Sequence, residues 1–248
     1  MNIPFPFPPA GSEIRSALAP SGILRAGINL SNTLLVSART PEGGPAGVSP
    51  DMALAVGAAL GVPVRLVSYK TPGEVADAIM RHEWDIGLIA DEPQRAETIA
   101  FTPAYAEIEA CYCVRANAGM AGNTDIDRPG HRIATTERAA FTLWLERHIK
   151  HATLVPADSL DGARELFASG GADVLASLKS KLEDHPIPDT NVLTPPFMTV
   201  QQAIGCAKSQ AAAAFWLSSF VRAACQSGFV ANCIQHHGVR GLQVAKSA

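Results

Sequence analysis

The segment DIGLIA, Asp85–Ala90, constrains the fold of this chain more than any other. It is short and almost wholly apolar, which is typical of a strand covered on both faces of a parallel sheet. A turn with a single arginine, Arg95, follows it, and an aromatic stretch then ends at Tyr105. Open α/β sheets bind ligands beyond the carboxyl ends of their strands. Arg95 is therefore a candidate for binding a carboxylate, and the alternative is a solvated arginine that caps a turn.

Strands and helices alternate on both sides of this segment. The order β-α-β-α-β occurs twice and predicts an α/β protein with parallel sheets. Helix starts are expected at Ser12, Ser49, Thr71 and Asp158, each acting as an N-cap. Further strands are predicted at 23–30, 64–68, 106–115, 131–135, 152–155, 173–177 and 197–206, and helices at 12–19, 49–60, 71–80, 139–149, 158–168, 209–225 and 228–237.

Composition excludes several classes of function. The chain has 248 residues, 17% of them charged, and a net charge of −3, so a nucleic-acid partner is not expected. Its five cysteines are odd in number and lack framework spacing, which predicts buried thiols without disulfides. No P-loop, dinucleotide fingerprint or metal-ligand cluster is present, so we expect no cofactor and no metal.

The first 20 residues form an extension rich in proline and phenylalanine. Residues 4–9 cannot form a helix, and we expect Phe5 and Phe7 to pack on the body or on a neighbouring subunit, which would allow a homo-oligomer. The segment lacks the basic start and apolar run of a secretory signal. Localisation therefore stays open between the periplasm and the cytoplasm.

Arg95 lies six residues before Phe101 and ten before Tyr105, with Pro93 two residues ahead of it. This spacing resembles the polar amino-acid-binding family, family 3, of ABC-transporter periplasmic solute-binding proteins. The turn at Ala90 departs from the family, which has hydroxyl residues there. The resemblance implies a type II periplasmic-binding-protein-like fold, in which each of two lobes is a mostly parallel sheet flanked by helices. Lobe 1 would comprise 21–108 and 203–248, lobe 2 would comprise 109–202, and the strands at 106–115 and 197–206 would be the hinge crossovers.

The resemblance also implies a ligand site in lobe 1. Arg95 and the N–H of Ala90 would bind an α-carboxylate. Asn29 and Asn32 follow the first predicted strand and are expected either to bind ligand or to close a turn. On the return crossover, only one of two adjacent glutamines can face the cleft, and Gln202 is the favoured one.

In lobe 2, the family's Gly-Ser/Thr-Thr turn corresponds to Glu137-Arg138-Ala139, which lacks the glycine and the hydroxyls. Arg138 and Ala139 are still expected at a helix start that can receive an anion. The acid that normally binds the α-ammonium is replaced by Leu178. Lys179 follows, and it is expected either to bind a second anionic group or to be solvated. Substitutes for the missing acid would be Asp91, Glu92 or Glu109.

The sequence therefore predicts a solute-binding protein that holds a small carboxylate-bearing metabolite, an amino acid or an organic acid, in an interlobe cleft with hinge closure. It would act as in ABC-type uptake, with an ABC permease as partner if exported, and not as an enzyme. One alternative is a cytoplasmic ligand-sensing or interaction module of the same fold. A further alternative is a dehydratase-like enzyme acting on a cyclic acid.

Overall fold

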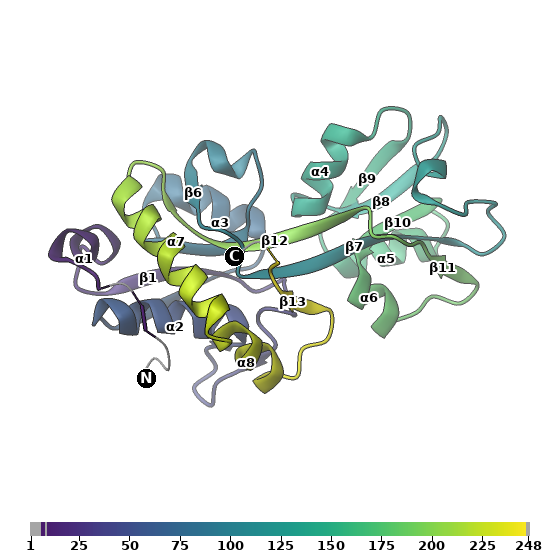
Figure 1. The fold of residues 1–248 in the computed structure, drawn as a ribbon. Coiled ribbons are helices and arrows are strands. Elements are labelled where there is room, and N and C mark those ends of the chain that lie inside the picture. Colours follow the sequence, from purple (N-terminus) through teal and green to yellow (C-terminus); the bar gives the residue numbers. More distant parts are fainter. Residues whose placement is uncertain (1–5, 8, 247–248) are drawn as a thin grey trace. The chain divides into compact units, whose positions relative to one another are not determined.

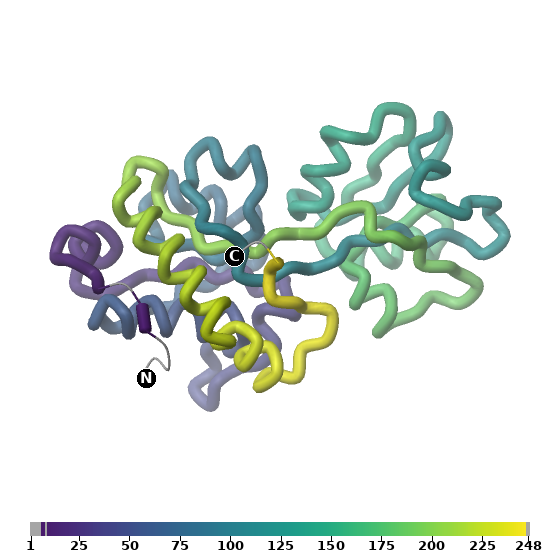
Figure 2. Tube along the Cα trace, viewed as in Figure 1, coloured from purple at the N-terminus to yellow at the C-terminus, as the bar shows by residue number. Residues whose placement is uncertain are grey.

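The chain folds into two compact units in the computed structural model, which describes residues 6–7 and 9–246. Unit 1 comprises Met1–Glu107 and Gln201–Ala248, and unit 2 comprises Ile108–Val200. The chain enters unit 2 along strand β7 (Ala106–Arg115) and returns to unit 1 along strand β12 (Met198–Ala207). Figure 2 traces these two passages. Both passages are strands of ten residues, so each unit contains part of each strand.

Unit 1 is built on three parallel strands in the spatial order β4-β1-β5, with β12 antiparallel to β5. Figure 1 labels β1 and β12 of this sheet. Helix α2 connects β1 to β4, and helix α3 connects β4 to β5 in the opposite direction across the sheet. Right-handed crossovers therefore place α2 and α3 on opposite faces. The chain order reverses between β1 and β5. The bounds are β1 Leu24–Asn29, α2 Val48–Leu60, β4 Val64–Tyr69, α3 Pro72–Ala78, 3-10 helix η1 Ile79–Arg81, β5 Ile86–Ala90, 3-10 helix η2 Arg95–Glu97 and β6 Ile99–Phe101.

Trp84 is the largest fully buried side chain among the described residues, and it packs against one face of this sheet. It is 2% exposed, and its Nε1–H donates to the carbonyl oxygen of Val75 at 2.8 Å. The indole lies against Gly27 of β1 and Gly87 of β5, where an added Cβ would come within 2.9 and 3.0 Å of ring atoms. These two glycines are therefore required by the close approach of the ring.

Further elements complete unit 1. Helix α1 packs against the start of α7, where the Gln210 amide donates to the Ala17 carbonyl oxygen at 2.9 Å. The ring of Phe7 lies 6.3 Å from that of Phe220 on α7, so this part of the extension packs on the body of its own chain. Phe5 lies outside the described residues. The bounds are α1 Ser12–Leu18, β2 Ala38–Arg39, β3 Pro45–Ala46, α7 Ala211–Gln226, α8 Phe229–His236 and β13 Leu242–Val244.

Unit 2 repeats the plan of unit 1. Its parallel strands lie in the order β10-β8-β9, β7 is antiparallel to β10, and the chain order reverses between β8 and β10. Each strand therefore has a counterpart in unit 1. The bounds are 3-10 helix η3 Asn123–Asp125, β8 Arg132–Thr136, α4 Ala140–His148, β9 Thr153–Ala157, α5 Leu160–Ala168, β10 Val174–Leu178, α6 Lys179–Asp184 and β11 Thr190–Val192.

The repeat extends to one side-chain interaction at the amino edge of each sheet. In unit 1, Asp85 accepts from the backbone N–H of Arg25 at 2.8 Å and from its guanidinium at 3.0 and 2.6 Å. In unit 2, Asp173 accepts from the backbone N–H of Arg132 at 2.9 Å and from its guanidinium at 3.1 and 3.0 Å. In each unit this bidentate ion pair joins the strand before the chain reversal to the strand after it.

The predicted N-caps are only partly confirmed. Thr71 caps α3 as predicted, accepting from the N–H of Glu74 at 3.2 Å. The prediction is wrong for Ser12, which is the first residue of α1 after Gly11, and for Ser49, which lies inside α2 after Gly47. Asp158 is also not the cap of α5, because Ser159 occupies that position and accepts from the N–H of Gly162.

All five cysteines are free, as predicted, and Cys225 is the only one that is not buried. Within the described residues, no helix combines the length and the apolar character needed to cross a membrane. Helix α6 and the short strands β2, β3, β6, β11 and β13 were not predicted from the sequence.

Candidate functional site

Arg95 lies at the chain reversal of unit 1, just beyond the carboxyl end of β5. Its side chain is buried, with 5% of the residue exposed, and Nη1 donates to the carbonyl oxygen of Ala90 at 3.0 Å. The expectation of a solvated arginine that caps a surface turn is therefore wrong. A buried guanidinium fixed by the end of a strand is oriented in advance, which suits bidentate binding of a carboxylate.

Ala90 binds Arg95 through its carbonyl oxygen, and its partner on β12 is Gln202. Asp91 donates its N–H to the Gln201 carbonyl oxygen of β12 at 2.9 Å, so by the alternation of a β-ladder Ala90 directs its N–H away from β12. Gln202 is directly opposite Ala90 in the ladder, and opposed side chains share one face of a sheet. Gln202 is 4% exposed, and its carbonyl oxygen accepts from the N–H of Tyr105 at 2.8 Å.

The side-chain oxygens of the two predicted asparagines close turns. Asn29 is the last residue of β1, and its Oδ1 accepts from the N–H of Ser31 at 3.1 Å and from its hydroxyl at 2.8 Å. Asn32 Oδ1 accepts from the N–H of Leu34 at 3.2 Å. These bonds are turn chemistry, one of the two expected roles. Asn29 nevertheless lies at the carboxyl end of the strand next to β5, so it stays a candidate ligand-binding residue.

Tyr105 has a structural role in unit 1. It is fully buried, and its hydroxyl is 2.8 Å from that of Ser49 on α2. Burial raises the pKa of the Tyr105 hydroxyl, so that this hydroxyl stays neutral. The same contact explains why Ser49 does not cap α2, since its hydroxyl is used inside the core.

In unit 2, the turn after β8 contains Arg138 and Ala139. Arg138 is exposed and has a left-handed backbone with φ of 54°, and Ala139 is the N-cap residue of α4. This turn lacks the family's hydroxyl residues, but threonines lie on either side of it. Thr142, in the first turn of α4, donates to the Thr136 carbonyl oxygen at 2.6 Å and lies 2.6 Å from the hydroxyl of Thr135.

The end of β8 carries one further polar group. Among the described residues, the buried hydroxyl oxygen of Thr136 has no hydrogen-bond partner. Backbone N–H groups in the first turn of a helix also have no partner within the helix. Thr136 and the start of α4 therefore offer polar groups for an anion, and the signal in the sequence was the Thr135-Thr136 pair at the end of a predicted strand.

Lys179, at the start of α6, forms an ion pair. Its Nζ donates to Glu109 Oε2 at 2.8 Å, and both side chains are about one third exposed, at 31% and 37%. This hydrogen bond raises the pKa of Lys179. Leu178 is 7% exposed and lies opposite Ala110, next to Glu109 in β7. Neighbouring residues of a strand face opposite sides, so Glu109 lies on the other face of β7 from Ala110, and it is already paired with Lys179.

Two acids of unit 1 lie between the end of β5 and Arg95. Glu92 is 3% exposed, and one of its carboxylate oxygens accepts from the N–H of Gln94 at 2.9 Å. The exposed Asp91 has a raised pKa, because neighbouring protein atoms reduce its solvation and the Glu92 charge repels it, while Arg95 opposes the rise. Within the described residues, no three His, Cys, Asp or Glu side chains are grouped to hold a metal ion.

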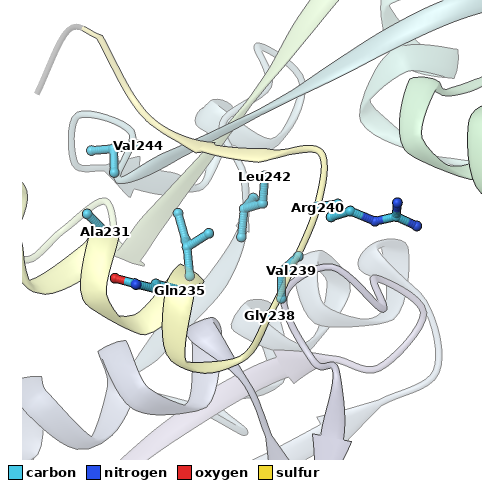
Figure 3. A pocket seen from close by; sticks show the side chains of 8 residues that line it. Ala231, Gln235, Gly238, Val239, Arg240, Leu242 and Val244 are labelled. Carbon is cyan, nitrogen blue, oxygen red and sulfur yellow. The ribbon is translucent and has the colours of Figure 1, made fainter.

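A separate hollow of about 460 Å³ lies between α8 and β13 in unit 1. Its walls are mostly aliphatic, from residues such as Ile234 and Leu242, and none of the predicted site residues lines it. Arg240 also lines this hollow, but its guanidinium extends away from the side chains of α8 (Figure 3). The hollow is therefore not part of the candidate site.

A profile of the bacterial extracellular solute-binding proteins, family 3, matches residues 24–238. The chain belongs to this family. The match covers both passages between the units and every candidate site residue. No protein of curated function matches the chain significantly in sequence.

Solved structures similar to this family 3 chain are two-lobed proteins of the type II periplasmic-binding fold. A mutant of ArgBP from T. maritima is 16% identical, with a TM-score of 0.72 over 92% of this chain and 100% of that one. A putative binding component of an ABC transporter from Wolinella succinogenes, complexed with lysine, is 17% identical, with a TM-score of 0.73 over 87% and 95%. The ancestral amino acid-binding protein AncCDT-1, a precursor of cyclohexadienyl dehydratase, is 17% identical, with a TM-score of 0.71 over 90% and 98%. At these identities the likeness establishes the fold.

Proposed function

We propose that this chain binds a small carboxylate-bearing solute, an amino acid or an organic acid, through Arg95. The observation that carries the proposal is the buried guanidinium at the carboxyl end of β5, held by the Ala90 carbonyl oxygen at 3.0 Å. A guanidinium has five N–H donors in a fixed fork, and a carboxylate can accept two of them in parallel. The strand end thus fixes the position of the group that would recognise the ligand.

The family and the fold support solute binding, and the chemistry around Arg95 supports an anionic group on the solute. An α-ammonium would need its own acid, because an unpaired buried charge is costly. Leu178 replaces the acid expected in unit 2, and Glu109 is paired with Lys179 at 2.8 Å. Asp91 and Glu92 are the acids nearest to Arg95 in sequence. A solute with an amine would therefore bind beside these two acids, or would have to displace Lys179 from Glu109.

The test is a thermal-shift screen of the purified protein against amino acids and, separately, against mono- and dicarboxylates that lack an amine. A ligand that binds only the folded state raises the melting temperature by mass action. Calorimetric titration of the best ligand into wild type and Arg95→Gln then tests the arginine. Losing one partner of a desolvated charge pair costs about 2–5 kcal/mol, so affinity should fall by more than about thirtyfold.

Arg65→Gln is the matched control, because Arg65 is an exposed arginine on β4 of the same unit. It should leave affinity unchanged. Arg95→Gln also leaves the Ala90 carbonyl with a weaker partner, and we expect a loss of about 1–3 kcal/mol in unfolding free energy. Binding should therefore be measured below the melting temperature of the variant. A folded Arg95→Gln protein with wild-type affinity would refute the proposal.

We further propose an ABC permease as the partner, as expected for solute uptake. The dehydratase alternative predicts a different outcome of the same screen. A dehydratase would consume the cyclic acid that stabilises it, and this turnover would be detected by chromatography of the ligand after incubation. A ligand recovered intact after binding supports the solute-binding proposal over the enzyme.

A further inference from the structure

Unit 2 contains a small, mostly enclosed cavity that is formed by residues outside the candidate site. It has a volume of about 50 Å³ and lies among helix α5, strand β10 and helix α6. An ordered water needs about 10–15 Å³ of such space, so the cavity has room for about three to five waters or for one small ion. The lining residues are Leu160, Asp161, Arg164, Leu175, Ser177, Lys181, Leu182 and His185.

The fold makes one side of this cavity rigid and apolar. Leu175 and Ser177 are two residues apart on β10 and therefore face the same side of the sheet. Leu175 and Leu182 belong to a buried core cluster that also contains Cys113 and Phe167. The polar residues at the cavity thus belong to packed elements of one unit, which fix the positions of their backbones.

Two cations line the cavity without a partner of their own. Arg164 and Lys181 are both half-buried, and among the described residues neither side chain forms a hydrogen bond or an ion pair. Other cations of unit 2 do form ion pairs, since Arg132 pairs with Asp173 and Lys179 pairs with Glu109. Two like charges beside one partly enclosed space repel each other, and a bound anion would offset that repulsion.

Ser177 adds a neutral donor at the same cavity. The residue is 4% exposed, and in the described part of the chain its hydroxyl has no hydrogen-bond partner. Asp161 is the one acid among the lining residues, against the two cations and His185. Because this hydroxyl makes no other hydrogen bond among the described residues, it can donate to an acceptor bound in the cavity.

We propose that this cavity is a binding site for a small tetrahedral oxyanion, phosphate or sulfate. A guanidinium, an ammonium and a hydroxyl from three different elements line a space of this size, and together they supply donors in several directions, as a tetrahedral anion requires. The site lies within unit 2 and does not involve Arg95. It is therefore independent of the solute site proposed for unit 1.

The experiment is equilibrium dialysis of the intact chain with radiolabelled inorganic phosphate, and separately with inorganic sulfate, at constant ionic strength set with chloride. We expect saturable binding of one ion per chain. Arg164→Gln and Lys181→Gln should each weaken it by at least about fivefold, because each removes a charge-assisted hydrogen bond. Ser177→Ala should weaken binding by less, since the hydroxyl is a neutral donor.

Two controls separate this site from other causes. Lys150→Gln removes the same charge from an exposed position of unit 2 and should leave binding unchanged. Arg95→Gln should also leave it unchanged, even if that variant loses solute binding. The proposal is overturned by the absence of saturable binding at millimolar phosphate and sulfate, by equal weakening in Lys150→Gln, or by loss of the ion in Arg95→Gln. Circular dichroism of each variant confirms that it is folded.

Discussion

The two Arg–Asp ion pairs at the amino edges of the sheets have similar hydrogen bonds but differ in burial. Both aspartates accept a backbone N–H and a bidentate guanidinium from the paired arginine. The exposed fractions of the side chains differ, at 5% for Asp85 and 23% for Arg25, against 36% for Asp173 and 45% for Arg132. The contribution of each pair to the unfolding free energy should therefore differ, although the geometry is the same.

We predict that Asp85→Asn destabilises the protein far more than Asp173→Asn. Removing one partner of a buried pair costs about 3–5 kcal/mol, and the partial exposure of Arg25 places this case near 3 kcal/mol. An exposed pair contributes about 1 kcal/mol or less, which is the expected cost for Asp173→Asn. The asparagine keeps the size of the side chain and one acceptor, so the charge and one hydrogen bond account for most of the difference.

Urea unfolding followed by far-UV circular dichroism measures both costs as shifts of the midpoint at unchanged slope. A double-mutant cycle with Arg25→Gln isolates the pair from the effects of each single change. Glu42→Gln, a charge loss at an exposed loop residue, should have no effect. Equal costs for the two aspartates, or a larger cost at Asp173, would show that burial does not set the strength of this interaction.

Three further outcomes are expected from single changes. Arg132 lowers the pKa of Asp173 in the folded protein. The difference in unfolding free energy between wild type and Asp173→Asn should therefore be complete above about pH 4 and be lost as the pH falls through the folded-state pKa of Asp173. Urea unfolding at several pH values measures this difference. Tyr105→Phe loses the 2.8 Å contact with Ser49 and should cost about 1 kcal/mol without changing solute affinity. Gly27→Ala places a Cβ 2.9 Å from the Trp84 ring and should cost about 1–3 kcal/mol in the same unfolding assay.

Much of the fold could be predicted because strong local patterns and tertiary structure agree. The apolar DIGLIA segment forms β5, the predicted strand at 106–115 has the observed bounds of β7, and Thr71 caps α3 beside Pro72. The errors occur where a distant partner decides. Ser49 has the local pattern of a cap, but its hydroxyl binds Tyr105, 56 residues away. Short strands such as β13 depend on pairing with a distant strand, and three residues carry too little periodicity to show it.

The location of the candidate site could be predicted from the sequence, but its side-chain contacts could not. The place of Arg95 follows from the rule that ligands lie beyond the carboxyl ends of parallel strands, but its burial and its bond to Ala90 do not. The Lys179–Glu109 pair joins residues 70 positions apart, which no local pattern indicates. The hydroxyls near the turn after β8 were missed because they lie on either side of the family's turn positions, at Thr136 and Thr142.

The sheets of the two units have the same strand arrangement. The units are alike at the amino ends of these strands and differ at the carboxyl ends. At the amino edges, both units keep the same ion pair, so changes there are expected to alter stability. At the carboxyl edges the units differ, with a buried arginine at Arg95 in unit 1 and threonine hydroxyls, Leu178 and a lysine–glutamate pair in unit 2. Because the amino-edge bonds do not involve these groups, we expect changes at the carboxyl edges to leave those bonds intact. This separation agrees with a fold shared at 16–17% identity with similar solved structures, while Ala90, Arg138 and Leu178 depart from the pattern that the resemblance implies.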